Sequence, residues 1–285
     1  MQVKPLLQLG KPQIILPVTL SALTGFILFQ GVFAGPWLSC IAGVLLLSSA
    51  SAVINQIQEA GRDLLMERTR TRPIPSGKVS KSTAWLLAIP LAIAGFFLLW
   101  FNCGPLPAGL ALFTLLWYNG VYTPLKTKTA FAVIPGALVG ALPPVIGWTA
   151  AGGVPWHLHI ILVAFFFFVG QIPHFWLILL KYEGDYEKAG FPTLRGIFSR
   201  RQLRNLTLGW TAATAMAAIL MPLFGVISSA WLSAILLLAG PGLMLSFIPW
   251  LGRQEKSMQT GPAFRNINAF YLLVMLVLIT DALLR

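Results

Sequence analysis

Long apolar stretches separated by short polar connections run through the whole chain. Nine of these stretches have close to the ~20 residues that a helix needs to cross a hydrocarbon core roughly 30 Å thick. Within a bilayer only helices and closed barrels satisfy their backbone hydrogen bonds, and stretches of this length indicate helices. The pattern therefore predicts an all-α polytopic membrane protein with nine transmembrane helices in one bundle. We expect the spans near 13–31, 38–58, 84–102, 105–122, 131–150, 157–180, 205–223, 229–250 and 266–284.

The composition supports a membrane protein without a separate soluble domain. Of the 285 residues, 57% are hydrophobic and only 10% are charged, and the mean hydropathy is +0.79. Because a soluble domain has about 25% charged residues, a soluble enzyme, a disordered protein and a secreted disulfide scaffold are excluded. We expect residues 1–285 to form a single integral-membrane domain, whose longest connections lie near 58–83 and 181–204.

Basic residues concentrate on one side of the predicted bundle. All but one of the 20 Lys and Arg residues precede the first span or lie in a connection that follows an even-numbered span, the exception being Arg285. Because positively charged loops stay in the cytoplasm, this alternation places the N-terminus there and supports the span count. The net charge of +12 therefore reflects orientation in a lipid bilayer and not nucleic-acid binding. We expect a multi-pass protein of the cytoplasmic (inner) membrane, with its active site toward the cytoplasm.

The first of two acidic clusters lies where the second predicted helix leaves the membrane. Asn55, Glu59 and Asp63 are spaced by four residues, so a continuing helix places them on one face. An amide and two carboxylates supply the hard oxygen ligands that suit Mg²⁺. Arg68 and Arg72 follow, and guanidinium groups match the oxygens of phosphate. This combination predicts a site for a diphosphate bridged by magnesium.

The second acidic cluster follows the sixth predicted helix. If that helix continues past the membrane surface, His174, Lys181, Tyr182 and Asp185 share one stripe. A lone histidine on an apolar helix is often a hydrogen-bonded packing residue, and the alignment makes a functional role an equal alternative. Together the two clusters hold six of the eight acidic residues. The competing interpretation is that these acids only neutralise the arginines of their own loops.

Both clusters resemble those of the UbiA-type intramembrane prenyltransferases, a family of nine-helix proteins. The first cluster carries the signature Asn-x3-acid-x3-Asp, followed by Glu-Arg-Thr-x-x-Arg-Pro at 67–73. Further stretches resemble the heme O synthase branch of the family. They are Gly10-Lys-Pro12, Tyr122-Thr-Pro-Leu-Lys126, the Pro- and Gly-rich stretch 135–144, Pro173-His-Phe-Trp176, Lys181-Tyr-x-x-Asp185-Tyr and Ala189-Gly-Phe-Pro192. The sequence departs from the family pattern at Glu59, where Asp is usual, and at Gly61, where an acid is expected.

The resemblance implies transfer of a farnesyl group from farnesyl diphosphate to a vinyl group of heme b, with Mg²⁺ as cofactor. It assigns the metal and diphosphate to Asn55, Glu59, Asp63 and Asp185, and the substrates to Arg68, Arg72, Lys126, Lys181, Tyr182 and Tyr122. On this view His174 orients heme or handles a proton. The resemblance also implies that the product is handed to heme A synthase or a heme–copper oxidase.

Three other functions remain open from the sequence. A UbiA-type enzyme that prenylates an aromatic ring or a quinone precursor shares the diphosphate chemistry and differs in the acceptor. Lys181, in place of a further Asp, counts against it. A cation-coupled transporter would carry acids near the middle of the bilayer and inverted repeats, whereas these acids lie at helix ends on one side. The missing acid at Gly61 also leaves an inactive scaffold open.

Overall fold

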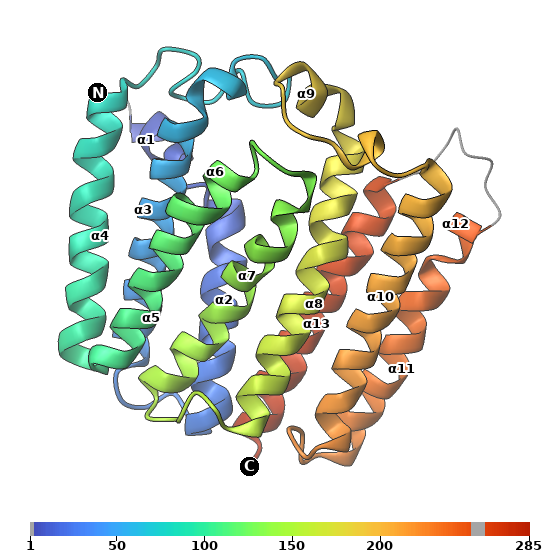
Figure 1. The fold of residues 1–285 in the computed structure, drawn as a ribbon. Helices are drawn as coiled ribbons and strands as arrows, with labels where there is room; N and C mark the ends of the chain where they lie inside the picture. Colours follow the sequence, from blue (N-terminus) through green and yellow to red (C-terminus); the bar gives the residue numbers. More distant parts are fainter. Residues whose placement is uncertain (1–2, 252–259) are drawn as a thin grey trace.

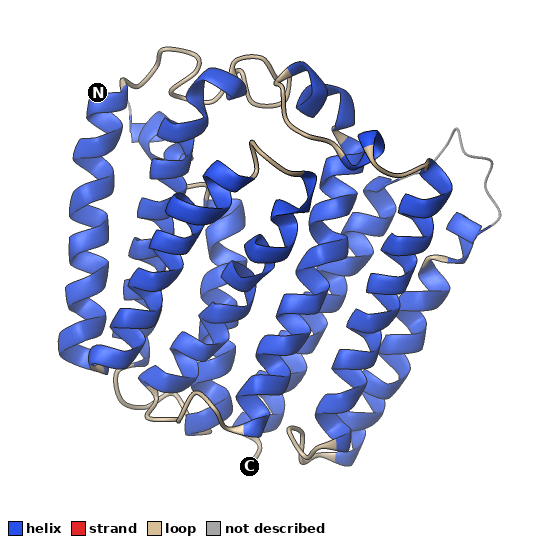
Figure 2. Ribbon diagram, in the orientation of Figure 1, coloured by secondary structure: helices blue, strands red, loops and turns tan. Residues whose placement is uncertain are grey.

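The structure is a computed structural model that describes residues 3–251 and 260–285, and all regular elements in this part are helices (Figures 1 and 2). The long helices are α2 (Pro12–Gln30), α3 (Trp37–Asp63), α4 (Lys81–Cys103), α5 (Pro105–Leu116), α7 (Val133–Ala150), α8 (Leu158–Lys181), α10 (Arg200–Leu223), α11 (Ala230–Ser246) and α13 (Thr260–Leu283). The short ones are α1 (Val3–Leu9), η1 (Trp117–Tyr122), α6 (Thr123–Leu125), η2 (Ala130–Ala132), α9 (Glu183–Lys188), η3 (Leu194–Gly196) and α12 (Ile248–Leu251). The long helices lie side by side in one bundle (Figure 1).

A helix occupies each of the nine ranges predicted to cross the membrane. In the described part of the chain, seven helices are long and apolar enough to span a bilayer, with η2 and α7 counted as one. The other two predicted ranges hold shorter helices. One is α5, with 12 residues, which continues into the π-helical turn η1, and the other is α11, with 17. The multi-pass helical architecture is therefore confirmed, and the count of nine crossings remains a prediction.

Three helices extend further toward the loops than predicted, and one of them is α13, which begins at Thr260 and not near 266. The α3 helix has 27 residues and ends at Asp63, so the first acidic cluster lies on regular helix. The α10 helix begins at Arg200, because the side chains of Ser199 and Gln202 form a reciprocal capping box at its start. The boundaries predicted from hydropathy alone end where the apolar residues end, whereas the hydrogen-bonded helix continues.

The single stripe expected along the sixth predicted helix is interrupted. The α8 helix ends at Lys181, and Tyr182 leaves the helical conformation with φ −115° and ψ 26°. Asp185 then lies on the separate short helix α9. The condition for one continuous stripe from His174 to Asp185 is therefore not met, and only tertiary contacts can bring Asp185 to the other site residues.

The α2 and α7 helices cross at close range. A Cβ on Gly25 would lie 1.9 Å from the carbonyl oxygen of Pro144, and one on Gly147 would lie 1.8 Å from that of Ala22. Small residues of this kind let membrane helices approach closely. The crossing lies toward the end of the bundle that holds the C-terminal end of α13, opposite α1 and α9 (Figure 1). We call the end with α1, α9 and residues 64–80 the charged end.

Candidate active site

One face of the last turns of α3 carries three buried polar residues. Asn55, Glu59 and Asp63 expose only 3%, 5% and 0% of their surface. They follow one another at intervals of one helical turn, as their spacing predicted. Burying a carboxylate is costly unless it is paired and hydrogen-bonded, so the partners of these residues define the chemistry of the site.

Two lysines that are distant in the sequence reach this face. The Nζ atom of Lys11, just before α2, donates to Oδ1 of Asn55 at 2.7 Å. The Nζ atom of Lys126, just after α6, donates to Oε1 of Glu59 at 3.0 Å. The amide of Asn55 also donates to the hydroxyl of Thr123 at 3.2 Å. The first turns of α2, the last turns of α3 and the segment after η1 therefore meet at one point.

The third residue of the row is paired within its own loop. Nη1 of Arg72 donates to both carboxylate oxygens of Asp63, at 2.9 and 2.7 Å. The hydroxyl of Thr69 donates to the Asp63 carbonyl oxygen at 2.9 Å and fixes the turn that follows the helix. Asp63 is thus paired with an arginine of its own loop, as the competing interpretation expects, and whether it also holds a metal ion remains a prediction.

The two lysines differ in their electrostatic surroundings. Burial, together with the nearby charge of Arg72, lowers the pKa of Lys11 to about 7, because the amide of Asn55 offers no opposite charge. Burial also disfavours the charged form of Lys126, but the negative charge of Glu59 outweighs it and raises the pKa of Lys126 above its usual range. Lys126 is therefore protonated and carries a positive charge beside Glu59.

The second predicted cluster is assembled by contacts with the loop that follows α3. An Oδ2 atom of Asp185 accepts a hydrogen bond from the backbone N–H of Arg68 at 3.2 Å. The guanidinium of Arg68 lies 4.8 Å from the centre of the Tyr182 ring, and Nζ of Lys181 lies 5.1 Å from the same ring. The structure thus brings together Arg68, Lys181, Tyr182 and Asp185, four of the residues singled out in the sequence.

Lys126 connects the two clusters. Beyond Glu59, its ammonium lies 5.4 Å from the centre of the Tyr186 ring and 4.8 Å from that of Phe191. These two rings pack with Met66, which is almost fully buried, in a small apolar cluster between the two loops. The α9 segment therefore covers the acidic end of α3, with one lysine contacting both.

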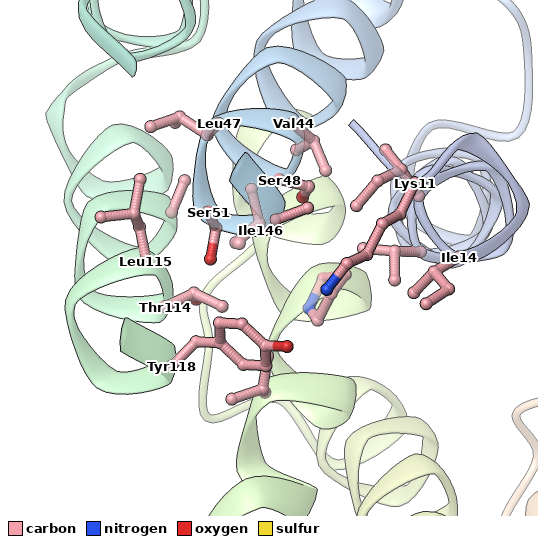
Figure 3. Close-up of a pocket in the computed structure, with 16 residues that line it drawn as sticks. Lys11, Ile14, Val44, Leu47, Ser48, Ser51, Thr114, Leu115, Tyr118 and Ile146 are labelled. Carbon is pink, nitrogen blue, oxygen red and sulfur yellow. The ribbon is translucent and has the colours of Figure 1, made fainter. Parts of the chain in front are cut away.

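An apolar pocket extends from this point into the bundle (Figure 3). It is a partly open hollow with a cavity volume of about 110 Å³. Figure 3 shows the Lys11 amine and the Tyr118 hydroxyl pointing toward one another into it. Its walls come from α2, α3, α5 with η1, and α7. They are mostly apolar, with Ser48 and Thr114 among the polar residues and with Val44 and Ala111 among the deeper ones.

Tyr122 belongs to a row of aromatic rings that leads away from the pocket. Its ring centre lies 5.3 Å from that of Tyr118, which lines the pocket, and 6.1 Å from that of Phe175 on α8. Gly136 of α7 makes room for it, since a Cβ there would lie 2.6 Å from the Tyr122 ring. The predicted substrate-binding role of Tyr122 is compatible with this place, and remains a prediction.

His174 lies apart from the acidic residues. It precedes Lys181 by seven residues on the continuous helix α8, a rise of about 10 Å. Its ring packs against Phe264 of α13 at 4.8 Å and lies 6.3 Å from Tyr271. Among the described residues its buried Nδ1 atom has no hydrogen-bond partner. Its predicted role therefore concerns the space between α8 and α13 and not the metal.

The described residues include no group of three His, Cys, Asp or Glu side chains that could hold a metal ion by themselves. Asn55, Glu59 and Asp63 nevertheless present hard oxygen atoms in one buried row, and each already faces a basic side chain. Mg²⁺ is commonly held by one or two carboxylates together with substrate phosphates. The oxygen atoms of Asn55, Glu59 and Asp63 therefore fit Mg²⁺, provided that substrate phosphates supply further ligands.

Sequence reasoning overlooked several residues that shape the site. Lys11 was noted only within the Gly10-Lys-Pro12 stretch, yet it contacts the acidic row and lines the pocket. Ser51 donates to Oδ1 of Asn119 at 2.8 Å and joins α3 to the π-helical turn that presents Tyr118. The available signal was the presence of Ser51 and Asn119 inside predicted spans, whereas Lys11 lies just before the first one.

Comparison with known proteins identifies the class of protein. A model of the UbiA prenyltransferase family matches residues 16–274. The chain therefore belongs to the UbiA prenyltransferase family. Similar folds occur in a solved structure of digeranylgeranylglyceryl phosphate synthase (TM-score 0.78, 15% identity, 99% of each chain) and in a UbiA homolog from Archaeoglobus fulgidus bound to GPP and Mg²⁺ (TM-score 0.72, 15% identity, 99% of this chain and 100% of the other).

Closer relatives in sequence share one name. The protoheme IX farnesyltransferase of Geobacter sulfurreducens is 39% identical over 82% of this chain and 88% of its own length. The protein of that name from Oleidesulfovibrio alaskensis is 36% identical over 93% of this chain and 92% of its own. The chain thus matches nearly the full length of relatives from one branch of the family.

Proposed function

We propose that this protein transfers a farnesyl group from farnesyl diphosphate to a vinyl group of heme b and so forms heme O. The observation that carries the proposal is the apolar pocket that begins at Lys11, directly beside the buried row on α3. The shared name of the relatives supports heme as the acceptor. The GPP and Mg²⁺ bound by a structural neighbour support a prenyl diphosphate as the donor.

The residues that would hold Mg²⁺ are Asn55, Glu59 and Asp63, with Asp185 from the covering segment. When bound, the ion neutralises charge that develops on the departing diphosphate. The basic residues around this row would bind the phosphate oxygens, and they are Lys11, Arg68, Arg72 and Lys126. The diphosphate would then lie at the charged end, with the farnesyl chain directed into the pocket.

The reaction starts when the bond between the first farnesyl carbon and the diphosphate oxygen breaks, with both electrons leaving on the diphosphate. The resulting allylic cation is shielded from bulk water in the pocket, and the ring faces of Tyr118 and Tyr122 stabilise it. The vinyl carbon of heme attacks the cation, one water adds to the new carbocation, and that water loses a proton. His174 orients heme or accepts this proton, and Lys181 and Tyr182 contact a heme propionate or the diphosphate.

The chain would form a single integral-membrane domain in the cytoplasmic (inner) membrane, with nine crossings and the N-terminus in the cytoplasm. This arrangement is supported by a helix in each predicted range and by the positions of α1 and the end of α13 at opposite ends of the bundle (Figure 1). The basic residues of the charged end support an active site that faces the cytoplasm. Handover of the product to heme A synthase or a heme–copper oxidase would follow.

The direct test is to incubate the purified protein with heme b, farnesyl diphosphate and Mg²⁺. We expect a heme product heavier by one farnesyl group and one hydroxyl group, detected by mass spectrometry. EDTA should abolish its formation, and added Mg²⁺ should restore it. A prenylated product from a phenolic acceptor, with none from heme, would overturn the proposal in favour of an aromatic prenyltransferase.

A further inference from the structure

The oxygens proposed to bind metal contact basic side chains of the protein itself. Lys11, Lys126 and Arg72 donate to Asn55, Glu59 and Asp63 respectively, one basic side chain for each residue of the row. A metal ion that uses these oxygens must therefore move at least one basic side chain. The contacts of Lys11, Lys126 and Arg72 indicate which of these side chains can move and where it would go.

The three contacts differ in how firmly they are fixed. Arg72 holds both oxygens of Asp63, and Thr69 ties the same turn to the end of α3, so this pair is rigid. Lys11 contacts a neutral amide, which leaves no negative charge unpaired if it moves. Lys126 alone neutralises a carboxylate through a single hydrogen bond, at the end of a flexible stem.

Lys126 also has a second set of partners outside the acidic row. Its ammonium lies near the ring faces of Tyr186 and Phe191, which belong to the segment covering the site. These faces attract a cation without holding it in one place. The side chain can therefore leave Glu59 and remain at the entrance, where the proposed diphosphate lies.

Resting on the proposed function, we propose that the ammonium of Lys126 neutralises Glu59 until a metal ion takes its place. Lys126 then leaves Glu59 when a prenyl diphosphate offers it a phosphate oxygen. The bound metal then pairs with Glu59, and Lys126 pairs with a phosphate oxygen. Binding of the metal therefore increases the affinity for the diphosphate. Binding of the diphosphate increases the affinity for the metal by the same factor, because both effects express one coupling free energy. Lys126 thus has opposite effects on the binding of the two ligands.

The test measures Mn²⁺ binding by electron paramagnetic resonance, with and without the slowly reacting analogue farnesyl thiodiphosphate. In the wild-type protein the analogue should increase Mn²⁺ affinity by roughly 5- to 150-fold, the usual range of such couplings. Lys126→Met should bind Mn²⁺ alone more tightly than wild type, bind the analogue alone more weakly, and lose most of the coupling. Lys128→Met, two residues further on and exposed, is the matched control and should behave as wild type.

Removing Lys126 leaves Glu59 buried without a countercharge, so Lys126→Gln, which can still donate a hydrogen bond, serves as a second variant. Both variants should gain more thermal stability from Mn²⁺ alone than the wild type does. If neither variant binds Mn²⁺ alone more tightly than wild type, the inference is wrong even though the wild type binds both ligands. If the wild-type protein binds neither ligand, the proposed function itself fails.

Discussion

The depth of the pocket predicts how Ala111→Phe changes the choice of prenyl donor. Along α3, the pocket residues Ser51 and Val44 are seven positions apart, which corresponds to a depth of about 10 Å. An extended farnesyl chain is roughly 13 Å long if each of its bonds advances as far as a bond of an extended polypeptide. The chain must therefore fill the whole depth of the pocket and either bend or emerge at its deep end. Ala111 on α5 is buried at this deep end.

A phenyl ring at Ala111 would occupy the space needed by the last isoprene unit of farnesyl but not by the shorter geranyl chain. Overfilling a well-packed site costs about 1–3 kcal/mol. Since 1.4 kcal/mol is tenfold, kcat/KM for farnesyl diphosphate relative to geranyl diphosphate should fall by roughly 5- to 150-fold. We expect most of the loss to appear with the longer donor.

The assay compares the two donors at saturating heme b and Mg²⁺. Leu106→Phe is the matched control, because this residue lies on the same helix but is exposed. Thermal unfolding of each variant in detergent checks that the fold is kept. If a folded Ala111→Phe protein shows the same donor preference as wild type, the pocket does not hold the prenyl chain.

The remaining predictions address three other residues. Asp63→Asn should reduce heme O formation by about 100- to 1,000-fold, since it removes a carboxylate proposed to hold the Mg²⁺ that would neutralise the departing diphosphate, while Arg72 stays in place; an unchanged rate would remove Asp63 from the site. His174→Ala should lower turnover or heme affinity, measured by product formation and heme titration, and unchanged values for both would mean that His174 only packs. Asp281 on α13 is buried and accepts hydrogen bonds from Arg285 and from two backbone N–H groups before α11. Asp281→Asn should therefore lower stability by about 1–3 kcal/mol without changing donor preference, and a melting temperature equal to wild type would contradict this.

Local periodicity was sufficient to predict the helices and one face of the site. Asn55, Glu59 and Asp63 share a face because a helix repeats every 3.6 residues, and nothing beyond the sequence is needed to infer this. A helix also occupies each of the nine apolar ranges, which were predicted from the length of the apolar runs. What the hydropathy could not indicate is that α3 continues to Asp63, since the polar residues that end an apolar run do not end a helix.

The partners of these residues could not be predicted in the same way. Lys11 and Lys126 are 44 and 67 positions away from the residues that they contact. Their approach depends on how α2, α3 and the segment after η1 pack, which no local pattern encodes. The same holds for Asp185, which reaches the loop after α3 although α8 ends at Lys181, four residues earlier.

The balance of charge at the site separates an enzyme acting on an anion from a carrier of cations. A cation-coupled transporter needs acidic oxygens that are free to receive its ion. Here Glu59 and Asp63 bring two negative charges, and three basic side chains face their row: Lys11, Lys126 and Arg72. Because burying unpaired charge is costly, burial together with this excess of basic groups lowers the pKa of Lys11 to about 7, and an incoming anion would favour its charged form. The basic loops that orient the chain in the membrane therefore also create the binding preference expected for a diphosphate.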